Sequence, residues 1–331
     1  MASGEQTSGG TSYDSILLIA FGGPTSGDQS YDYVKGIVGN RAGAEPRIRA
    51  VARHYEHFDG SPFNEHTFRQ AEHLRAALAR RGLDVPVYCG MRHWHPYVRE
   101  VLARMAEAGC RNTLGVIMAP HQCWISWDWY QNCVNEGNGR LGDRRLTFTY
   151  VDPWWQEPAF IEANAARLQE AFARLCGQAA QAQLIFSAHA IPINACQFCK
   201  NEERRCPYSV QFEETARLVA QAVGRGADYL TCYQSQAGVA SEWTRPAVRE
   251  VIAACKQRGV GAVVISPIGF LVDHIEVLWD LDMDVKKLCE EYRITYERAE
   301  TVESHPAFIE LLADRVLARY QGRARLEAPL H

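Results

Sequence analysis

Residues 263–284 read Val-Val-Ile-Ser-Pro-Ile-Gly-Phe-Leu-Val-Asp-His-Ile-Glu-Val-Leu-Trp-Asp-Leu-Asp-Met-Asp. The apolar start predicts a buried strand, Pro267 and Gly269 predict a turn, and a helix is expected to follow. At about 100° per residue, four acidic residues of that helix fall within a sector of roughly 80°. We call them the acidic line: Asp273, Glu276, Asp280 and Asp284. Since like charges in a row destabilise a helix, the pattern indicates a compensating partner, for which a divalent cation is a candidate.

The simpler interpretation of such a line is a solvated helix face. Two features favour a binding site. The opposite face, with Ile275, Leu278 and Asp282, is not cleanly apolar. The acids also follow the carboxyl end of a strand, which is where open α/β sheets bind ligands.

Composition excludes several classes of protein. The 331 residues carry a formal net charge of -4 and 47% hydrophobic residues, which fits two α/β domains or one large one. No polybasic arm indicates a nucleic-acid partner, and no apolar run approaches the roughly 20 residues that span a bilayer. Residues 1–12 are Gly/Ser-rich without the apolar segment of a secretory signal, so we expect a disordered tail and a cytoplasmic protein. The composition allows a peripheral membrane contact, and it allows either a monomer or a homodimer.

Strand-like and helix-like segments alternate along the chain. Strands are expected at 16–20, 85–89, 113–118, 146–150, 183–187, 229–233, 262–266 and 294–297. Their continuous apolar character is typical of parallel strands buried on both faces. The sequence therefore predicts an α/β fold of two doubly wound (Rossmann-like) halves with a cleft between them. We expect domains at 13–155 and 156–322, with a last helix that could pack back on the first domain, and a second tail at 323–331.

The predicted loops at strand ends carry most of the candidate functional residues. The turn from Phe21 to Pro24 contains two glycines, which permit close approach of a ligand. Arg92 could bind a carboxylate through paired hydrogen bonds. Residues 124–130 hold three Trp and one Tyr. They could wall in a large flat ligand or pack a domain interface.

Two further loops belong to the second half. His189 lies in Ser-Ala-His-Ala-Ile-Pro, directly after a predicted buried strand, and is the best candidate base because neutral imidazole accepts a proton near pH 7. Tyr233 and Ser235 end another strand and add small polar donors.

Together these motifs resemble the ferrochelatase family, the enzymes that insert ferrous iron into a porphyrin. The resemblance runs from Ile16 to Tyr320. Its most specific parts are the Ser-Ala-His loop and the segment 267–278. The Gly-Gly-Pro turn, Gly-Ser-Pro at 60–62, Arg92 with His95-Pro96, and Tyr233-Gln-Ser235 add to it.

The resemblance implies two flavodoxin-like halves, as in class II chelatases, with the porphyrin between them. It implies that His189 and Glu276 are catalytic and bind the iron, and that Asp280 and Asp284 extend the metal path. It further implies substrate-binding roles for Phe21, Arg92, Tyr233, Ser235, Phe270, Asp273 and His274. The last two are expected to orient Glu276. Imidazole and carboxylate together are suitable ligands for iron. The sequence does not decide which of the two groups takes the pyrrole protons. It also does not decide whether the substrate is protoporphyrin IX or coproporphyrin III.

A cysteine motif departs from the usual pattern of the family. Cys196, Cys199 and Cys206 form C-x2-C-x6-C-Pro, a spacing at which thiolates converge on one metal centre. Some ferrochelatases hold a [2Fe–2S] cluster, often through a C-terminal extension, but here no cysteine follows Cys289. We expect an internal [2Fe–2S] cluster; structural zinc and free thiols are the alternatives. The candidates for the fourth ligand are, in order, Cys232, Cys123 and Cys133.

The sequence shows two smaller departures from the family pattern and allows three alternative functions. Some relatives have a Tyr that could bind metal at the position of Phe21. The Trp-rich loop replaces small hydroxyl residues of the family, so the sequence does not define the porphyrin contacts on that side. A cobalt or nickel chelatase of similar fold is one alternative. Such enzymes typically use two metal-binding histidines, so the histidine–glutamate pattern of this chain disfavours that function. A porphyrin or iron carrier without turnover is a further alternative. An iron–sulfur oxidoreductase is weakened because no nucleotide-binding fingerprint opens a helix.

Overall fold

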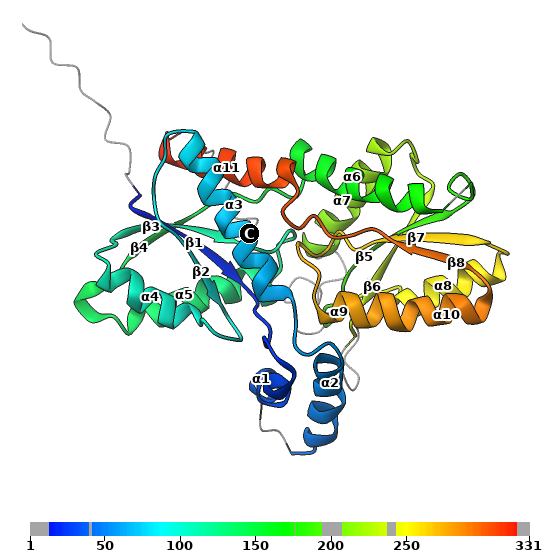
Figure 1. The fold of residues 1–331 in the computed structure, drawn as a ribbon, viewed down its shortest axis with the longest axis horizontal. Coiled ribbons are helices and arrows are strands. Elements are labelled where there is room, and N and C mark those ends of the chain that lie inside the picture. The colour runs from blue at the N-terminus through cyan, green and yellow to red at the C-terminus, as the bar shows by residue number, and fades with distance from the viewer. Residues whose placement is uncertain (1–12, 40–41, 176, 194–206, 237–242, 323–331) are drawn as a thin grey trace, which may run out of the picture.

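The computed structural model describes residues 13–39, 42–175, 177–193, 207–236 and 243–322. Two lobes, each a four-stranded parallel sheet between helices, lie side by side along the long axis (Figure 1). Both predicted tails and the cysteine motif at 196–206 lie outside the described residues. In the described part, no helix is long and apolar enough to cross a membrane.

The first sheet has the order β2-β1-β3-β4. Its strands are β1 (Ser15–Ala20), β2 (Val87–Met91), β3 (Asn112–Ile117) and β4 (Thr147–Tyr150). Side chains of β1 alternate between the two faces: Ile16 and Leu18 pack under α3 (Phe63–Arg80), whereas Leu17 and Ile19 pack under α4 (Val98–Glu107) and α5 (Trp129–Gly139). All four are fully buried, so the strand is apolar on both sides.

The second sheet repeats this plan with the order β6-β5-β7-β8. Its strands are β5 (Gln183–His189), β6 (Tyr229–Gln234), β7 (Ala262–Ser266) and β8 (Thr295–Arg298). One face is covered by α6 (Pro158–Arg174) and α7 (Pro207–Ala222), and the other by α8 (Val248–Gln257) and α10 (Lys286–Tyr292). The prediction of a two-part doubly wound α/β fold is confirmed.

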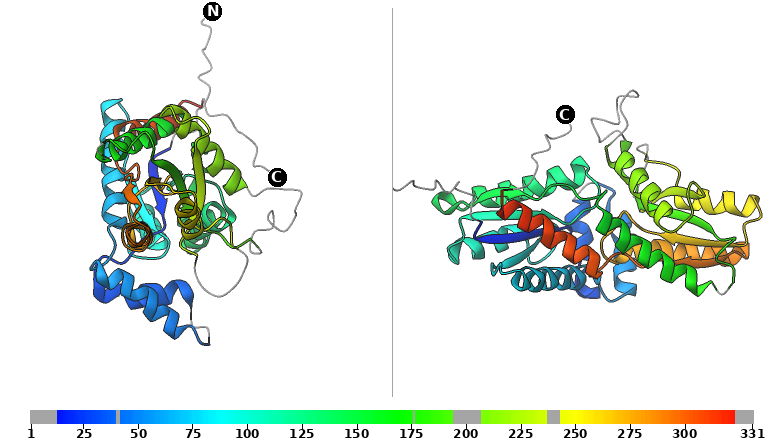
Figure 2. Two further views of the ribbon diagram at one scale, coloured as in Figure 1. Left: turned by 90° about the vertical axis from the view of Figure 1, so that its right-hand side faces the viewer. Right: turned by 90° about the horizontal axis from the view of Figure 1, so that it is seen from above.

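Two elements connect the lobes. The hairpin of α1 (Ser30–Val38) and α2 (Glu45–His57) projects from the body (Figures 1 and 2) and packs on the segment at 275–279. The last helix, α11 (Pro306–Tyr320), packs against both α3 and α6. Phe308 and Leu312 are fully buried there with Leu74 and Leu78 of α3. The last helix therefore shares the core of the first lobe.

The structure corrects two details of the predicted elements. The acidic helix is not a regular α-helix: a short α9 (Ile275–Val277) leads into a π-helical stretch, Leu278–Val285, before α10 begins. The Trp-rich segment contains a π-helical turn, Trp124–Asp128, and continues into α5, a helix that the sequence pattern did not indicate. Trp and Tyr side chains at irregular spacing hide helical periodicity, which explains the second difference.

Candidate active site

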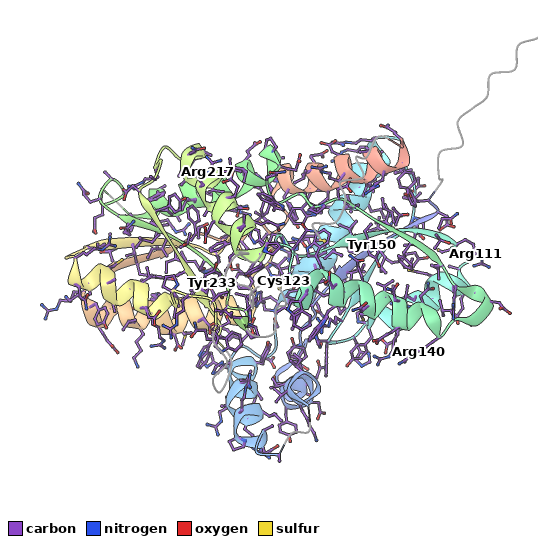
Figure 3. The ribbon with its side chains drawn as sticks, turned by 180° about the vertical axis from the view of Figure 1, so that it is seen from behind. Arg111, Cys123, Arg140, Tyr150, Arg217 and Tyr233 are labelled. Carbon is purple, nitrogen blue, oxygen red and sulfur yellow. The ribbon has the colours of Figure 1, made fainter. Side chains whose placement is uncertain are left out.

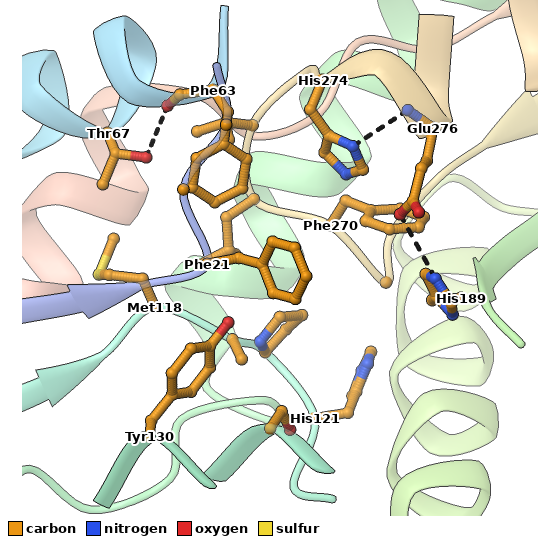
Figure 4. Close-up of a pocket in the computed structure, with 18 of the residues that line it drawn as sticks. Phe21, Phe63, Thr67, Met118, His121, Tyr130, His189, Phe270, His274 and Glu276 are labelled. Carbon is orange, nitrogen blue, oxygen red and sulfur yellow. Dashed lines mark hydrogen bonds and ion pairs between the residues drawn. The ribbon is translucent and has the colours of Figure 1, made fainter. Parts of the chain in front are cut away.

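A largely apolar cleft lies between the lobes at the carboxyl ends of both sheets. Phe21, Phe63, Met118, Tyr130 and Phe270 line it (Figure 4). The space between the lining residues is about 1120 Å³, part of it open solvent. The apolar walls suit a flat, apolar ligand.

His189 and Glu276 face each other across one end of this cleft. The imidazole Nε2 of His189 lies 3.3 Å from Oε2 of Glu276 (Figure 4), and their side chains are 33% and 42% exposed. His189 is the last residue of β5 and Glu276 belongs to α9. Gly269 allows the intervening turn to lie against β5, because a Cβ at this position would come within 2.6 Å of Ala188. The predicted pair is therefore brought together by two strand ends of one sheet.

The two groups stabilise each other's charged form. Burial lowers the pKa of His189, but the charge and hydrogen bond of Glu276 outweigh it and raise that pKa. Burial raises the pKa of Glu276, and the charge of His189 reverses the effect and lowers it. Nδ1 of His189 lies 2.5 Å from the carbonyl oxygen of Ala190, to which it can donate. Without metal, the mutual interaction thus favours an imidazolium and a carboxylate.

The acidic line continues from this pair towards the surface. Ser235, whose φ of 62° is unusual for a non-glycine residue, donates through Oγ to Oδ2 of Asp280 at 2.5 Å. Burial and the charge of Glu276 raise the pKa of Asp280 to about 7 against the opposing hydrogen bond of Ser235. Asp284 lies 2.9 Å from Arg249 in an exposed ion pair. Carboxylates thus lead from the surface to the cleft.

The prediction that Asp273 lies on the acidic line is wrong, because the helix begins only at Ile275 and Arg298 binds the Asp273 carboxylate. Asp273 and His274 instead support the arrangement. Nδ1 of His274 accepts the backbone N–H of Glu276 at 3.2 Å and caps α9. The Asp273 carboxylate is held by Arg298 at 2.8 and 3.2 Å and does not line the cleft. Arg298 also binds Asp282 at 2.7 Å, so Asp282 has a structural partner rather than a solvated position.

Other predicted substrate residues lie behind or beside the lining. Arg92 donates to the carbonyl of Ile125 at 3.0 Å, and its guanidinium lies 4.2 Å from the ring of Trp129. Tyr233 is buried in the core of the second lobe, near the junction of the lobes (Figure 3). Phe21, by contrast, is 36% exposed and contacts His93 with ring centroids 4.4 Å apart.

Several lining residues were not anticipated. Tyr33 and Tyr55, from the projecting hairpin, reach the cleft, where Tyr33 donates to the carbonyl of Gly22 at 2.8 Å. His121 and Tyr130, from the Trp-rich segment, form another wall. The aromatic density of that segment is visible in the sequence, whereas Tyr33 and Tyr55 occupy ordinary core positions of amphipathic helices, so no sequence signal distinguishes them.

Cys232, the first candidate for a fourth cluster ligand, lies deep in the second lobe. It is fully buried, its thiol lies 3.4 Å from the carbonyl of Phe186, and burial raises the pKa of the thiol. It faces the α8 side of the sheet, whereas α7, which begins directly after Cys206, covers the other side. Among the described residues, no group of three or more His, Cys, Asp or Glu side chains is arranged to hold a metal ion.

The two-lobed fold with a site between two parallel sheets is shared with solved chelatases. A sirohydrochlorin chelatase, SirB from Bacillus subtilis subspecies spizizenii solved with cobalt, has a TM-score of 0.54 at 11% identity, covering 93% of this chain and 95% of that one. At this level of identity the likeness shows the fold alone.

Sequence comparison gives the particular family. The ferrochelatase family model matches residues 13–320. A ferrochelatase of Rhodopirellula baltica is 33% identical over 314 residues, which are 93% of this chain and 86% of the relative. A coproporphyrin III ferrochelatase of Mycolicibacterium smegmatis is 33% identical over 325 residues, which are 96% and 94%. The chain belongs to the ferrochelatase family, whose members are ferro-lyases that insert iron into a porphyrin.

Proposed function

We propose that this protein inserts ferrous iron into coproporphyrin III, with His189 and Glu276 at the metallation centre. One observation supports this assignment most strongly: Nε2 of His189 lies 3.3 Å from Oε2 of Glu276 at the edge of an apolar cleft, where the acidic line ends. The choice of porphyrin is supported by relatives named coproporphyrin III ferrochelatases that are 33% identical.

The reaction exchanges two pyrrole N–H protons for one Fe²⁺. The ion would reach Glu276 along Asp284 and Asp280, because carboxylates attract a divalent cation. A dication beside Glu276 would displace the proton held by His189, since both compete for the same carboxylate. Once that proton has been passed outward, the freed imidazole nitrogen could accept the two pyrrole protons one after the other, releasing the first before it takes the second. Asp280, with a pKa of about 7, is suited to pass protons outward near neutral pH.

Parallel insertion assays test this proposal. Purified protein would be given ferrous iron with coproporphyrin III or protoporphyrin IX. We expect the ratio kcat/KM to favour coproporphyrin III, and a preference for protoporphyrin IX would overturn the choice of porphyrin. Replacing His189 by Ala or Glu276 by Gln should lower kcat by about 100-fold or more while porphyrin still binds. The exposed His73 supplies the control H73A, which should insert iron normally.

We also propose that Cys196, Cys199 and Cys206 hold a [2Fe–2S] cluster and that the fourth ligand is Cys123 rather than Cys232. Cys123 packs in the same core as Tyr208 and Phe212 of the first turns of α7, on the side where that helix begins. Cys133 packs in the outer core of the first lobe instead. Thiolates at the spacing of the motif converge on one centre, which supports a cluster site.

Iron and sulfide analysis with a visible spectrum of anaerobically purified protein tests the cluster. We expect a coloured sample with iron and sulfide in equal amounts. C123S should lose this spectrum and C232S should keep it. A colourless sample with bound zinc would replace the cluster by a structural zinc site. Loss of the spectrum in C232S but not in C123S would reverse the ligand assignment.

A further inference from the structure

An ion pair between His66 and Glu303 joins the two lobes beside the cleft. His66 lies near the start of α3 in the first lobe, and Glu303 lies in the loop between β8 and α11. Nδ1 of His66 contacts Oε2 of Glu303, and the two side chains are 21% and 14% exposed. Glu303 adopts a φ of 48°, in the left-handed region that is unfavourable for most residues other than glycine. Such a conformation persists only where surrounding contacts hold it.

Glu303 also holds the loop that leads to Glu276. Its second carboxylate oxygen, Oε1, accepts the backbone N–H of Asp273 at 2.7 Å. Its own backbone N–H donates to the carbonyl of Leu271 at 2.9 Å. Gln70 of α3 donates to the carbonyl of Glu303 at 2.8 Å. The segment at 271–273 is therefore attached to Glu303, and Glu303 is attached to α3 of the opposite lobe.

Two largely buried carboxylates, 16% and 14% exposed, meet at this junction, and each has its own cation. The hydroxyl of Thr301 lies 3.0 Å from Oδ1 of Asp273 and 3.2 Å from Oε1 of Glu303, and its single proton can serve only one of them. Arg298 neutralises Asp273 from within the second lobe. His66 neutralises Glu303 from the first lobe. Without the charge of His66, Glu303 would be an unpaired carboxylate beside another carboxylate, which is strongly unfavourable in a buried site.

The charge state of His66 agrees with this role. The hydrogen bond to Glu303 raises the pKa of His66; burial and Arg69 lower it, and Asp273 raises it further. The net direction is upward, which favours the imidazolium that Glu303 requires.

We propose that His66 and Glu303 form a positioning pair for metallation, through which the first lobe fixes Glu276 against His189. The inference rests on the proposed function. Asp273 is followed by His274, which caps α9 by accepting the backbone N–H of Glu276. A shift of the Asp273 backbone therefore passes to the Glu276 carboxylate within three residues. His66 and Glu303 do not line the cleft, so they act through Glu276 and do not touch the substrate.

Charge-removing variants of near-equal shape test the pair. We expect H66Q to lower kcat about tenfold, because small misplacements at a reacting centre are costly, and to leave KM for porphyrin within about twofold. The double variant H66Q/E303Q should recover most of kcat, since no unpaired buried carboxylate remains. The matched control is R81Q at the far end of α3, where Arg81 pairs with Glu310 and Asp314 of α11. Its kcat should equal that of the unmodified protein.

Hydrogen exchange of the segment 271–278 gives a readout independent of turnover. The Asp273 amide should exchange about tenfold faster in H66Q, as expected when local opening becomes tenfold more favourable, and the double variant should restore protection. Unchanged exchange in H66Q would overturn the inference, as would faster exchange with an unchanged kcat. If the unmodified protein inserts no metal, the proposed function fails. The exchange data then decide alone whether the pair holds this loop.

Discussion

At the residue scale, the centre consists of a histidine and a glutamate that are each charged because of the other. Burial lowers the pKa of His189 and raises the pKa of Glu276, and the charge of each group reverses the shift on the other. Such a pair is net neutral, so an apolar cleft can hold it without metal or substrate. A divalent cation that replaces the imidazolium proton restores a balanced site, and the neutral imidazole it leaves is a base.

Asp280 belongs to the acidic line, but its ionised form, unlike that of Glu276, is disfavoured in the folded protein. Its folded pKa of about 7 lies above the usual aspartate value of 3.8, mainly because of burial. The folded state therefore binds the Asp280 proton more tightly than the unfolded state does. This contribution to stability is fully present below about pH 4 and is lost as the pH rises towards 7.

We predict that D280N becomes stabilising, relative to the unmodified protein, as the pH rises. The Asn cannot ionise, so the difference in Tm should be near zero at pH 4 and about 2–4 °C at pH 8. Thermal melts across this range measure it. The control D284N removes an exposed, salt-bridged carboxylate and should change Tm little at any pH. A difference for D280N that does not grow with pH would contradict the raised pKa.

At the scale of elements, the strands and their order of appearance could be predicted, because runs such as Ile16–Ala20 are apolar on both faces. His189 could be predicted because it directly follows such a run, and Glu276 because it lies on the acidic line after the turn that ends another run. The π-helical stretch could not, because a π-helix and an α-helix carry similar side chains and differ in hydrogen bonding set by tertiary contacts. Tyr33 and Tyr55 were missed for a related reason. Their positions fit an amphipathic helix, and only the docking of the hairpin brings them to the cleft.

Trp279 shows how this docking is achieved. Its ring stacks on His54 of α2, with centroids 3.9 Å apart and planes 7° apart, and meets His57 edge-on at 5.7 Å. Trp279 lies in the π-helical stretch next to Asp280, so the hairpin and the acidic line share one contact. The projecting helices thus help to form the cleft from outside both sheets.

We predict that W279A loosens the hairpin and weakens porphyrin binding. The loss of the partly buried ring should lower the free energy of unfolding by about 2 kcal/mol. It should also raise KM for porphyrin several-fold, because Tyr33 and Tyr55 lose their fixed positions. Denaturant titration and insertion kinetics measure the two effects. W129A, which removes a 38% exposed ring from α5, is the comparison for stability. An unchanged KM in W279A would mean that the hairpin does not shape the porphyrin site.

At the scale of the whole molecule, the lobes are more closely joined than two separate sheets suggest. The expected division at residue 155 cuts the chain between the sheets, but α11 returns from the end of the described chain to cover α3. Leu312 is fully buried against Leu74 and Leu78, in a core that also includes Leu271 and Val272 of the loop before Glu276. The first lobe, taken alone, would expose this apolar surface. We infer that the lobes form one cooperative unit.

This inference predicts a single thermal transition for the entire chain. L312A, which opens a cavity at the junction, should lower the free energy of unfolding by about 3 kcal/mol and shift that one transition. L102A, in the outer core of the first lobe, should shift the same transition by a similar amount, although Leu102 is remote from the junction. Calorimetry tests both variants through the ratio of the calorimetric to the van't Hoff enthalpy, which should stay near one. If L102A splits the melt into two transitions, the lobes unfold independently. Glu276 would then be fixed against His189 by the second lobe alone.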